Sequence, residues 1–452
     1  MKKFVLAICV CLLINSSVFA TETTSEYLNL DWWKSFKDEN LVENLLKVYE
    51  NNYDLKNAEL KIKANEQIVK MQFANELPSV NFSGGIFRDL RAPRKQFGSM
   101  QIPYYSQNNF YLPITAGYEI DIWGKNRLKT KSKKQQLEII KQAERATYIS
   151  LTSGFAADYY NLIKTDKFIE LQKELIKTQK EILNMTEEKY KIGLIPVTEV
   201  LYQEKVLNTL KEEENNYIKT QEILINNLKV YLADSNRELK RTDFDNIILQ
   251  DSIPENIESK IIENRPDYLQ EEANLKRIGF DVRVAKKEFL PTFTIFGQIG
   301  LNSYSLSSLC STPSQFFAAG ILPNMDLFSG DRKRAMLKMQ KFRYEEALNN
   351  YQKTYLTAIS EINSSLVDYK TSKNNYNESL EKLSTEGKIF SLAQDKRDIG
   401  SSNELEVLLA KEIYLNTQKE LVSNKINSVL STIGLYKSVG GVDLNKINIG
   451  NL

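Results

Sequence analysis

The chain has 452 residues, of which 42% are hydrophobic and 26% are charged, a balance typical of a folded protein. Its net charge of +2 gives no support to a nucleic-acid binder. The complete absence of histidine excludes every mechanism that needs an imidazole base, and it removes the commonest zinc ligand.

The first 20 residues have the pattern of a secretory signal peptide: a basic start, an apolar stretch and a small residue at the end. We therefore expect cleavage after Ala20 and a mature chain that begins at Thr21. Cys9 as a lipid-bearing cysteine is a weaker alternative, because a bulky isoleucine precedes it. The mature chain then keeps a single cysteine, Cys310, and cannot form an internal disulfide.

No later charge-free apolar run reaches the ~18 residues that a membrane-spanning helix needs. Instead, the chain repeats itself. NNYD at 51–54 aligns with NRPD at 264–267 at an offset of 213, and Ile-Gly at 192–193 aligns with Ile-Gly at 399–400 at an offset of 207. Collinear landmarks of this kind indicate two copies of one unit. The predicted organisation is a signal peptide (1–20), a first repeat with an N-terminal segment (21–233), a connector (234–257), a second repeat (258–441) and a tail (442–452).

Each repeat is predicted to read helix, strand, loop, strand, long helix, turn, helix. Pro78 and Pro291 end the first helix of each copy, since the residue before proline avoids the α region. Alternating apolar and polar residues then predict strands, because side chains of a strand point to opposite faces in turn. The expected strands are 79–89, 108–122, 291–302 and 315–328.

The longest helix is predicted over about residues 127–190, which contain one glycine and no proline. About 60 helical residues span roughly 90 Å. Apolar residues recur at steps of 3, 4 and 4, and the same phase occurs in both copies, which indicates helices arranged in a pseudo-symmetric array. The seam comprises Leu137, Ile140, Glu144, Tyr148, Leu151, Phe155, Tyr159 and Leu162 in copy one, with Glu144 as its polar exception, and Tyr344, Ala347, Tyr351, Tyr355, Ala358, Ile362, Leu366 and Tyr369 in copy two.

Four strands cannot close a transmembrane barrel, which needs about eight. An open sheet edge in lipid leaves backbone groups unpaired. If these strands lie in a membrane, several chains must therefore share one barrel, and the long helices continue it as a tube. Transport is the natural function of such a tube.

Several segments resemble, in order and spacing, the outer membrane efflux (TolC) family, in the branch that serves RND-type multidrug pumps. They are WWKSFKDENL (32–41), YEIDIWGKNR (118–127), KYKIGLIPVTEVL (189–201), RPDYLQEEANL (265–275), VAKKEFLPTFTIFGQIGL (284–301), MDLFSGDRKRA (325–335), KRDIGSSNELEVL (396–408) and LYKSVGG (435–441). The resemblance implies an α+β membrane protein of the outer membrane that extends into the periplasm. It implies a homotrimer with a twelve-stranded β-barrel, a long α-helical tunnel and a belt built from the N-terminal stretch, the connector and the tail.

The resemblance also implies where the tunnel closes, at two helix-hairpin turns around Gly193 and Gly400. Residues at matching offsets are expected to line the periplasmic aperture: Tyr190, Thr198 and Glu199 in the first repeat, and Arg397, Ser402 and Glu406 in the second. Three copies of Glu406 on one axis attract cations and resist closure unless they are paired, and either Arg397 or Lys396 is a candidate partner. The local alternative is that both glutamates simply favour a helix N-terminus.

The resemblance implies that a periplasmic adaptor protein and an inner-membrane pump are partners, together with outer-membrane lipid. Small molecules are the expected cargo. The basic loop at 88–107 is expected to face outward, either towards anionic lipopolysaccharide or simply towards solvent.

Two further functions remain open: the outer-membrane component of a type I protein secretion system, and an envelope coiled-coil structural protein. The sequence has no acid–base constellation, metal cluster or phosphate loop, so we expect no enzymatic activity, no bound metal and no cofactor.

Overall fold

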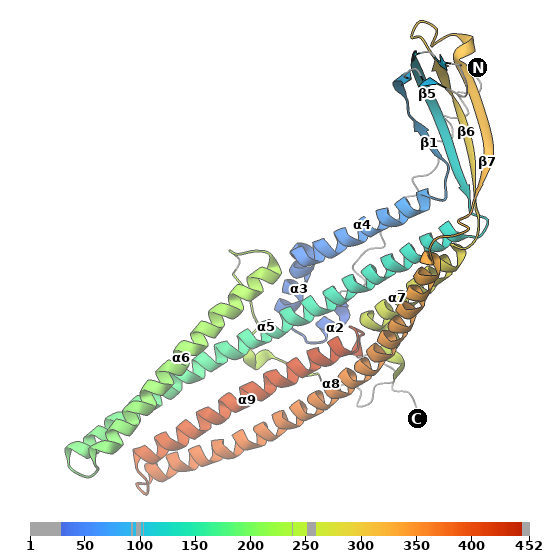
Figure 1. Ribbon diagram of the computed structural model, residues 1–452. Helices are drawn as coiled ribbons and strands as arrows, with labels where there is room; N and C mark the ends of the chain where they lie inside the picture. Colours follow the sequence, from blue (N-terminus) through green and yellow to red (C-terminus); the bar gives the residue numbers. More distant parts are fainter. Residues whose placement is uncertain are drawn as a thin grey trace.

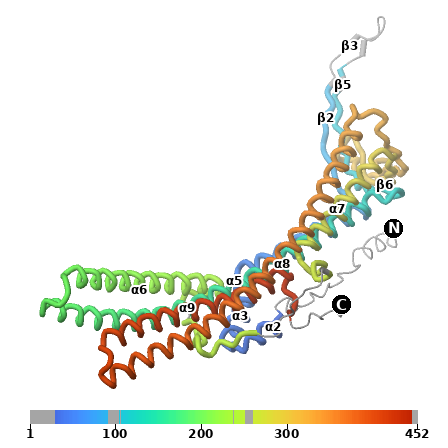
Figure 2. The backbone as a smooth tube through the Cα atoms, turned by 90° about the horizontal axis from the view of Figure 1, so that it is seen from below, coloured from blue at the N-terminus to red at the C-terminus, as the bar shows by residue number. Residues whose placement is uncertain are grey.

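The computed structural model describes residues 29–91, 94–95, 101–102, 104–236, 238–250 and 259–444. It shows an elongated molecule, with a β-sheet at one end and long helices that run away from it (Figure 1). Viewed from below, the helical part follows a curve (Figure 2). The expected signal peptide, with its cleavage site and Cys9, lies outside the described residues.

The helices are α2 (Leu30–Lys34), α3 (Glu39–Asn51), α4 (Tyr53–Ala74), α5 (Lys125–Lys191), α6 (Val197–Leu232), α7 (Pro266–Lys287), α8 (Arg332–Asp398) and α9 (Glu404–Ser438), with 3-10 turns at Phe244–Asn246, Ser259–Asn264 and Thr312–Ser314. The strands are β1 (Ser79–Phe82), β2 (Gly85–Arg91), β3 (Arg94–Lys95), β4 (Gln101–Ile102), β5 (Tyr105–Ile120), β6 (Thr292–Ser303) and β7 (Gln315–Asn324). Among these described residues, no helix combines the length and apolar composition needed to cross a membrane.

The main sheet is antiparallel, and its strands follow the order β1 and β2, then β5, β6 and β7. Its register places a row of apolar residues across four strands on one face. Ile114 lies opposite Phe82 on β1 and Ile299 on β6, and Ile299 lies opposite Phe317 on β7. These side chains are exposed in the single chain, from 46% for Ile114 to 75% for Phe317. The sheet therefore presents a broad apolar face to its surroundings, as the alternation predicts.

The structure differs from the prediction at the first strand and its loop. Strand 79–89 is divided into β1 and β2, and the ladder with β5 continues as far as the pair Arg91 and Tyr105. Residues 88–91 and 105–107, expected to belong to a loop, thus extend the hairpin, and the short strands β3 and β4 pair beyond it. Polar residues occur on both faces of this extension, so its sequence lacks the alternation of apolar and polar residues that predicts a strand.

The fourth strand is also shorter than expected, because β7 ends at Asn324 and not at Phe328. Leu327 and Phe328 lie beyond it and are 89% and 91% exposed. Pro323 has no backbone N–H to offer a ladder, and proline is typical of a strand's edge or end. The apolar residues at 325–328 therefore belong to the connection towards α8 and not to the strand.

The two long helices, α5 and α8, contain 67 residues each and leave the sheet together. Each returns through a shorter helix, α6 with 36 residues and α9 with 35. Helix α7 packs against both long helices in the half near the sheet, and α9 packs against both in the other half. The array is pseudo-symmetric as expected, although α7 and α9 lie between the long helices, which the shared seam did not reveal.

The N-terminal stretch and the connector meet beside α5, about midway along it (Figure 1). Asn40 Nδ2 donates to Thr242 Oγ1 at 3.2 Å, and Asn44 Nδ2 donates to the Lys240 carbonyl oxygen at 3.2 Å. Thr242 Oγ1 in turn donates to the Asp38 carboxylate at 2.7 Å. The two segments that the resemblance places in one belt are therefore in direct contact.

Arg265 joins the second repeat to the end of the chain's last helix. Its side chain is nearly buried, and Nη1 donates to the Ser438 carbonyl oxygen at 2.6 Å. Nη2 contacts Glu361 on α8 at 2.6 Å and Asp267 on α7 at 2.7 Å. One guanidinium therefore links α7, α8 and α9, because its planar fork can donate several hydrogen bonds at once.

Candidate functional site

Two helix-hairpin turns form the end of the molecule that lies farthest from the sheet (Figures 1 and 2). The first joins α5 to α6 through residues 192–196, and the second joins α8 to α9 through residues 399–403. All the residues predicted for the aperture belong to these turns or to the adjoining helix ends. The structure therefore gathers both predicted groups at one end.

The two turns have the same hydrogen-bond pattern. In the first, Leu194 N donates to the Lys189 carbonyl oxygen at 2.9 Å, and Gly193 N donates to that of Tyr190 at 2.8 Å. In the second, Ser401 N donates to Lys396 at 2.8 Å, and Gly400 N donates to Arg397 at 2.9 Å. These hydrogen bonds form a Schellman motif, in which a residue in the left-handed conformation ends the helix and backbone N–H groups bond to its last carbonyl groups.

The glycines are required by backbone conformation and not by lack of space. Gly193 has φ +77° and Gly400 has φ +75°, a region that L side chains adopt at a cost. A Cβ built on either glycine would meet nothing within 4 Å in the single chain. The pair Ile-Gly, found twice in the sequence, is therefore explained by two helix ends of the same geometry.

The returning helices begin differently in the two turns. Asn403 caps α9, since its Oδ1 accepts from Glu406 N at 3.0 Å. Pro196 stands at the same place before α6 and offers no side-chain cap. One turn further, Val200 and Val407 are buried and hold each returning helix against its partner. Both turns thus share the apolar contact, and the second adds a polar cap that the first lacks.

The predicted tip residues of the first repeat are open to solvent in the single chain. Tyr190 is 45% exposed, and Thr198 and Glu199 are also exposed. No ion pair to Glu199 occurs within the described part of the chain. A carboxylate in the first turn of α6 is favoured by the helix dipole, which agrees with the local alternative as well as with an aperture role.

In the second repeat, Arg397, one of the two candidate partners of Glu406, pairs with other residues within the chain. Its Nη2 lies 2.8 Å from Asp398 Oδ1, and its Nη1 lies 3.1 Å from Glu404 Oε2. Hydrogen bonds to Asp398 and then to Glu404 raise the pKa of Arg397 above its ordinary value. Glu406 instead accepts a hydrogen bond from Ser402. Within one chain Arg397 therefore pairs with Asp398 and Glu404 and not with Glu406.

Sequence reasoning missed Glu404 as the residue that ties Arg397 across the second turn. The distance along the chain is seven residues, and a helix end and a turn intervene, so no helical spacing rule connects them. Asn403 was missed as well, although an asparagine immediately before a helical segment is a recognisable capping signal. Both residues lie at the second hairpin, as do three of the predicted aperture residues.

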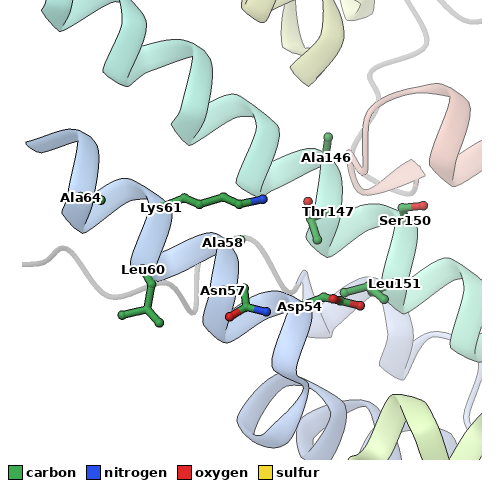
Figure 3. Close-up of a pocket in the computed structure, with 10 residues that line it drawn as sticks. All are labelled: Asp54, Asn57, Ala58, Leu60, Lys61, Ala64, Ala146, Thr147, Ser150 and Leu151. Carbon is green, nitrogen blue, oxygen red and sulfur yellow. The ribbon is translucent and has the colours of Figure 1, made fainter. Parts of the chain in front are cut away.

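An open groove of about 840 Å³ lies between α4 and α5. Figure 3 shows Lys61 extending from α4 towards α5 across this groove. Its lining consists of Asp54, Asn57, Ala58, Leu60, Lys61, Ala64, Ala146, Thr147, Ser150 and Leu151. Short side chains predominate, and these residues offer one carboxylate and one amine. Nowhere among the described residues do three or more His, Cys, Asp or Glu gather as a metal site would require.

The family model described as "Outer membrane efflux protein" matches residues 45–233 and 258–441, which is more than half of the chain. Among curated proteins, the probable efflux pump outer membrane protein TtgC of Pseudomonas putida is 25% identical over 415 residues, which cover 91% of this chain and 84% of TtgC. The antibiotic efflux pump outer membrane protein ArpC of the same species has the same identity and coverage.

Among solved structures, the Campylobacter jejuni CmeC outer membrane channel superimposes with a TM-score of 0.81. The alignment has 25% sequence identity and covers 91% of this chain and 88% of CmeC. The sheet at one end and the paired helical hairpins at the other are therefore the arrangement of a known outer membrane channel.

Proposed function

The chain belongs to the outer membrane efflux protein family, and on that premise we propose that three copies of it build one exit duct across the outer membrane and periplasm. The chain is an outer-membrane component of an efflux system, as its relatives TtgC and ArpC are. It lies in the outer membrane and extends into the periplasm, as channels of this fold do. The proposal adds to this that the duct contains three copies of the chain and that their strands close into one barrel.

The observation that carries the proposal is a sheet with an apolar face and two open edges, in which β1 and β2 share one position beside β5 and so make four strand positions in all. Strands β1 and β2 form one edge, and β7 forms the other, with no partner among the described residues. In lipid, each unpaired backbone group costs several kcal/mol, so a membrane sheet must close. Three copies supply twelve strands, which exceeds the minimum of about eight for a transmembrane barrel.

The apolar face supports a lipid environment for this sheet. Phe82, Ile114, Ile299 and Phe317 form one row across four strands and are all exposed. Monomeric soluble proteins rarely expose a contiguous patch of this kind. Lipid tails satisfy such a face, whereas the polar face, which includes Thr115 and Gln298, suits a water-filled interior.

We place the aperture of the duct at the two hairpin turns, with Tyr190, Thr198, Glu199, Arg397, Ser402 and Glu406 around it. Three copies bring six turns to one axis at the end of the duct. Glu199 and Glu406 then form rings of like charge, because Arg397 is engaged by Asp398 and Glu404. Such rings favour cations and oppose tight closure.

A periplasmic adaptor and an inner-membrane pump complete the system in this proposal, and small molecules are its cargo. The proposal follows the names of the relatives, which are outer membrane proteins of antibiotic and toluene efflux pumps. The tips at Gly193 and Gly400 are the surface nearest the inner membrane, so they are the place for an adaptor to bind.

The function is tested by restoring efflux in a bacterial strain that lacks its own outer membrane efflux components but retains pump and adaptor. Expression of the chain is expected to lower the accumulation of a fluorescent dye such as ethidium. A control strain that expresses the chain but also lacks the pump gene should accumulate the dye again. Unchanged accumulation by a trimer that reaches the outer membrane, together with secretion of a protein substrate, would favour a type I secretion role instead.

A further inference from the structure

A basic pocket lies between three helices close to the sheet, far from the hairpin turns. Its volume is about 230 Å³. The lining comes from α4, α5 and α7 and consists of Gln72, Lys129, Ser132, Lys133, Gln136, Arg277 and Asp281. Three cations therefore face one carboxylate in a small concave space.

The single carboxylate of the pocket is already engaged. Asp281 accepts a hydrogen bond from Ser132 Oγ at 2.7 Å and lies 3.4 Å from Arg277 Nη1. No ion pair to Lys129 or Lys133 occurs within the described ranges of the chain. The pocket therefore retains an excess of positive charge that its own residues do not neutralise.

Two buried donors in the lining have no acceptor. Gln72 Nε2 and Arg277 Nε are shielded from solvent and make no hydrogen bond to any described group. The remaining nitrogens of Arg277 are occupied, since Nη2 donates to Asn274 Oδ1 at 2.8 Å and Nη1 faces Asp281. A buried donor without a partner carries a desolvation cost, so the site lacks an acceptor and not a further cation.

The position of the pocket on α5 adds to its positive potential. Residues 125–134 read KNRLKTKSKK, with six basic residues in ten and no acidic residue in the first turn. Cations at a helix N-terminus oppose the helix dipole, which favours an anion there. The sequence places its strongest basic run where the local structure disfavours it, which an anionic ligand would offset.

The pocket lysines lie on the same helix as Lys125, which contacts the polar face of the sheet. Lys125 Nζ lies 3.6 Å from the carboxylate of Glu119, whose strand position belongs to the polar face. Lys129 and Lys133 follow at steps of four residues and so share a helix face with Lys125. Counting ~100° per residue, Tyr159, whose hydroxyl bonds to Asp38 in the N-terminal stretch, lies about 120° around α5 from Lys129. In the proposed trimer the pocket therefore faces the interior.

We propose that this pocket binds a small oxyanion, of the phosphate or carboxylate class, carried by a solute inside the duct. The location inside the duct rests on the proposed function, whereas all the residues that line the pocket belong to one chain. Lys129 and Lys133 supply charge-assisted hydrogen bonds to the oxyanion, next to the two unpaired donors in the lining. Three such pockets form a basic ring near the barrel, at the other end of the duct from Glu199 and Glu406.

The test measures binding of inorganic phosphate to the full-length protein in phosphatidylcholine nanodiscs by isothermal titration calorimetry at low salt. The double variant K129Q/K133Q is compared with K131Q/K134Q, which removes the same charge from the opposite face of α5. We expect phosphate affinity to fall at least about tenfold in the first variant and to be unchanged in the second. Added salt should weaken binding to the unmodified protein.

Equal loss in both double variants, or no phosphate binding by the unmodified protein, would overturn the proposal. A phospholipid headgroup is distinguished by repeating the titration in phosphatidylglycerol nanodiscs. Competition by that lipid would show that the pocket faces the bilayer and contradict the interior assignment. Pore formation in planar bilayers is recorded for the same preparations, so failure of the duct proposal is seen separately from failure of phosphate binding.

Discussion

Trp32 lies flat against Tyr436, with ring centroids 3.8 Å apart and planes inclined by 8°. Both side chains are almost completely buried, although 404 residues separate them. The contact joins the first described helix to the last one. The N-terminal segment is therefore an integral part of the helical body.

Replacing Trp32 by alanine should destabilise the helical part by about 3–5 kcal/mol, because it removes a fully buried aromatic ring and leaves a cavity. Thermal unfolding followed by circular dichroism measures the change. Tyr304→Ala is the matched control, since Tyr304 is 64% exposed and its loss should have little effect. Equal melting temperatures for Trp32→Ala and the unmodified protein would show that the stacking contact is absent in solution.

Gly193→Ala and Gly400→Ala should each cost about 1–2 kcal/mol, because alanine must adopt a left-handed backbone conformation at these sites. Steric clash makes no contribution in the single chain, since the added Cβ meets nothing within 4 Å. Circular dichroism melting measures the loss of stability.

Gly434→Ala provides the control for this comparison. It also has nothing within 4 Å of an added Cβ, but it lies inside α9 with an ordinary helical conformation. Alanine there should be neutral or stabilising by up to about 1 kcal/mol. If all three variants respond alike, the cost at the tips does not come from positive φ.

Ile114→Arg should cost about 2–4 kcal/mol if the residue lies near the bilayer midplane, since its side chain belongs to the apolar face. Thr115→Arg changes the adjacent residue of the same strand, but on the polar face. Heat-modifiable oligomers in outer-membrane fractions report assembly. We expect far fewer for Ile114→Arg than for Thr115→Arg, and the reverse order would show that the two faces are misassigned.

Stability should depend on pH through Asp267. Burial alone would raise its pKa, but hydrogen bonds and charge from Arg265 outweigh burial and hold the pKa below its usual range. Because the pKa of Asp267 is lower in the folded protein, its carboxylate stabilises the fold at pH values above the unfolded pKa of about 3.9. This stabilisation is lost as the pH falls through the folded pKa.

The unmodified protein should therefore melt higher than Asp267→Asn at pH 7, and the difference should shrink as pH falls below about 4. Melting curves from pH 7 to pH 3 measure it, with Asp31→Asn as an exposed control. A difference that stays constant over the whole range would exclude the ionic contribution of Asp267.

Much of the architecture was predictable because it rests on periodic patterns. Alternation over residues 108–122 predicted a strand with one apolar face, and the structure confirms it over Tyr105–Ile120. The long helix predicted at 127–190 extends over Lys125–Lys191. In both segments, burial on one face repeats over many residues, so the signal accumulates along the sequence.

Features that depend on single contacts were not predictable. Arg265 was noticed only as part of a repeated motif, whereas its bonds to Ser438 and Glu361 link positions 173 and 96 residues away. The pairing of Arg397 with Glu404 depends on the backbone course of a turn. Neither contact leaves a periodic trace, and one sequence does not show which of many charged residues are neighbours.

The predicted aperture residues are gathered at one end of the molecule, but their part in conduction stays a prediction. Positions from a family pattern identify the turns, and in the proposed trimer the rings form between chains. The charge of these rings is therefore the property to measure.

Single-channel recording of the purified protein in planar lipid bilayers tests the central claim most directly. The account predicts discrete pores with a preference for cations, and a preference reduced at least about twofold in Glu199→Lys/Glu406→Lys. Glu212→Lys, an exposed site in the middle of α6, should leave conductance and preference unchanged. The absence of pores from correctly inserted unmodified protein would contradict the account, and tip variants with unaltered conductance and selectivity would contradict its placement of the aperture.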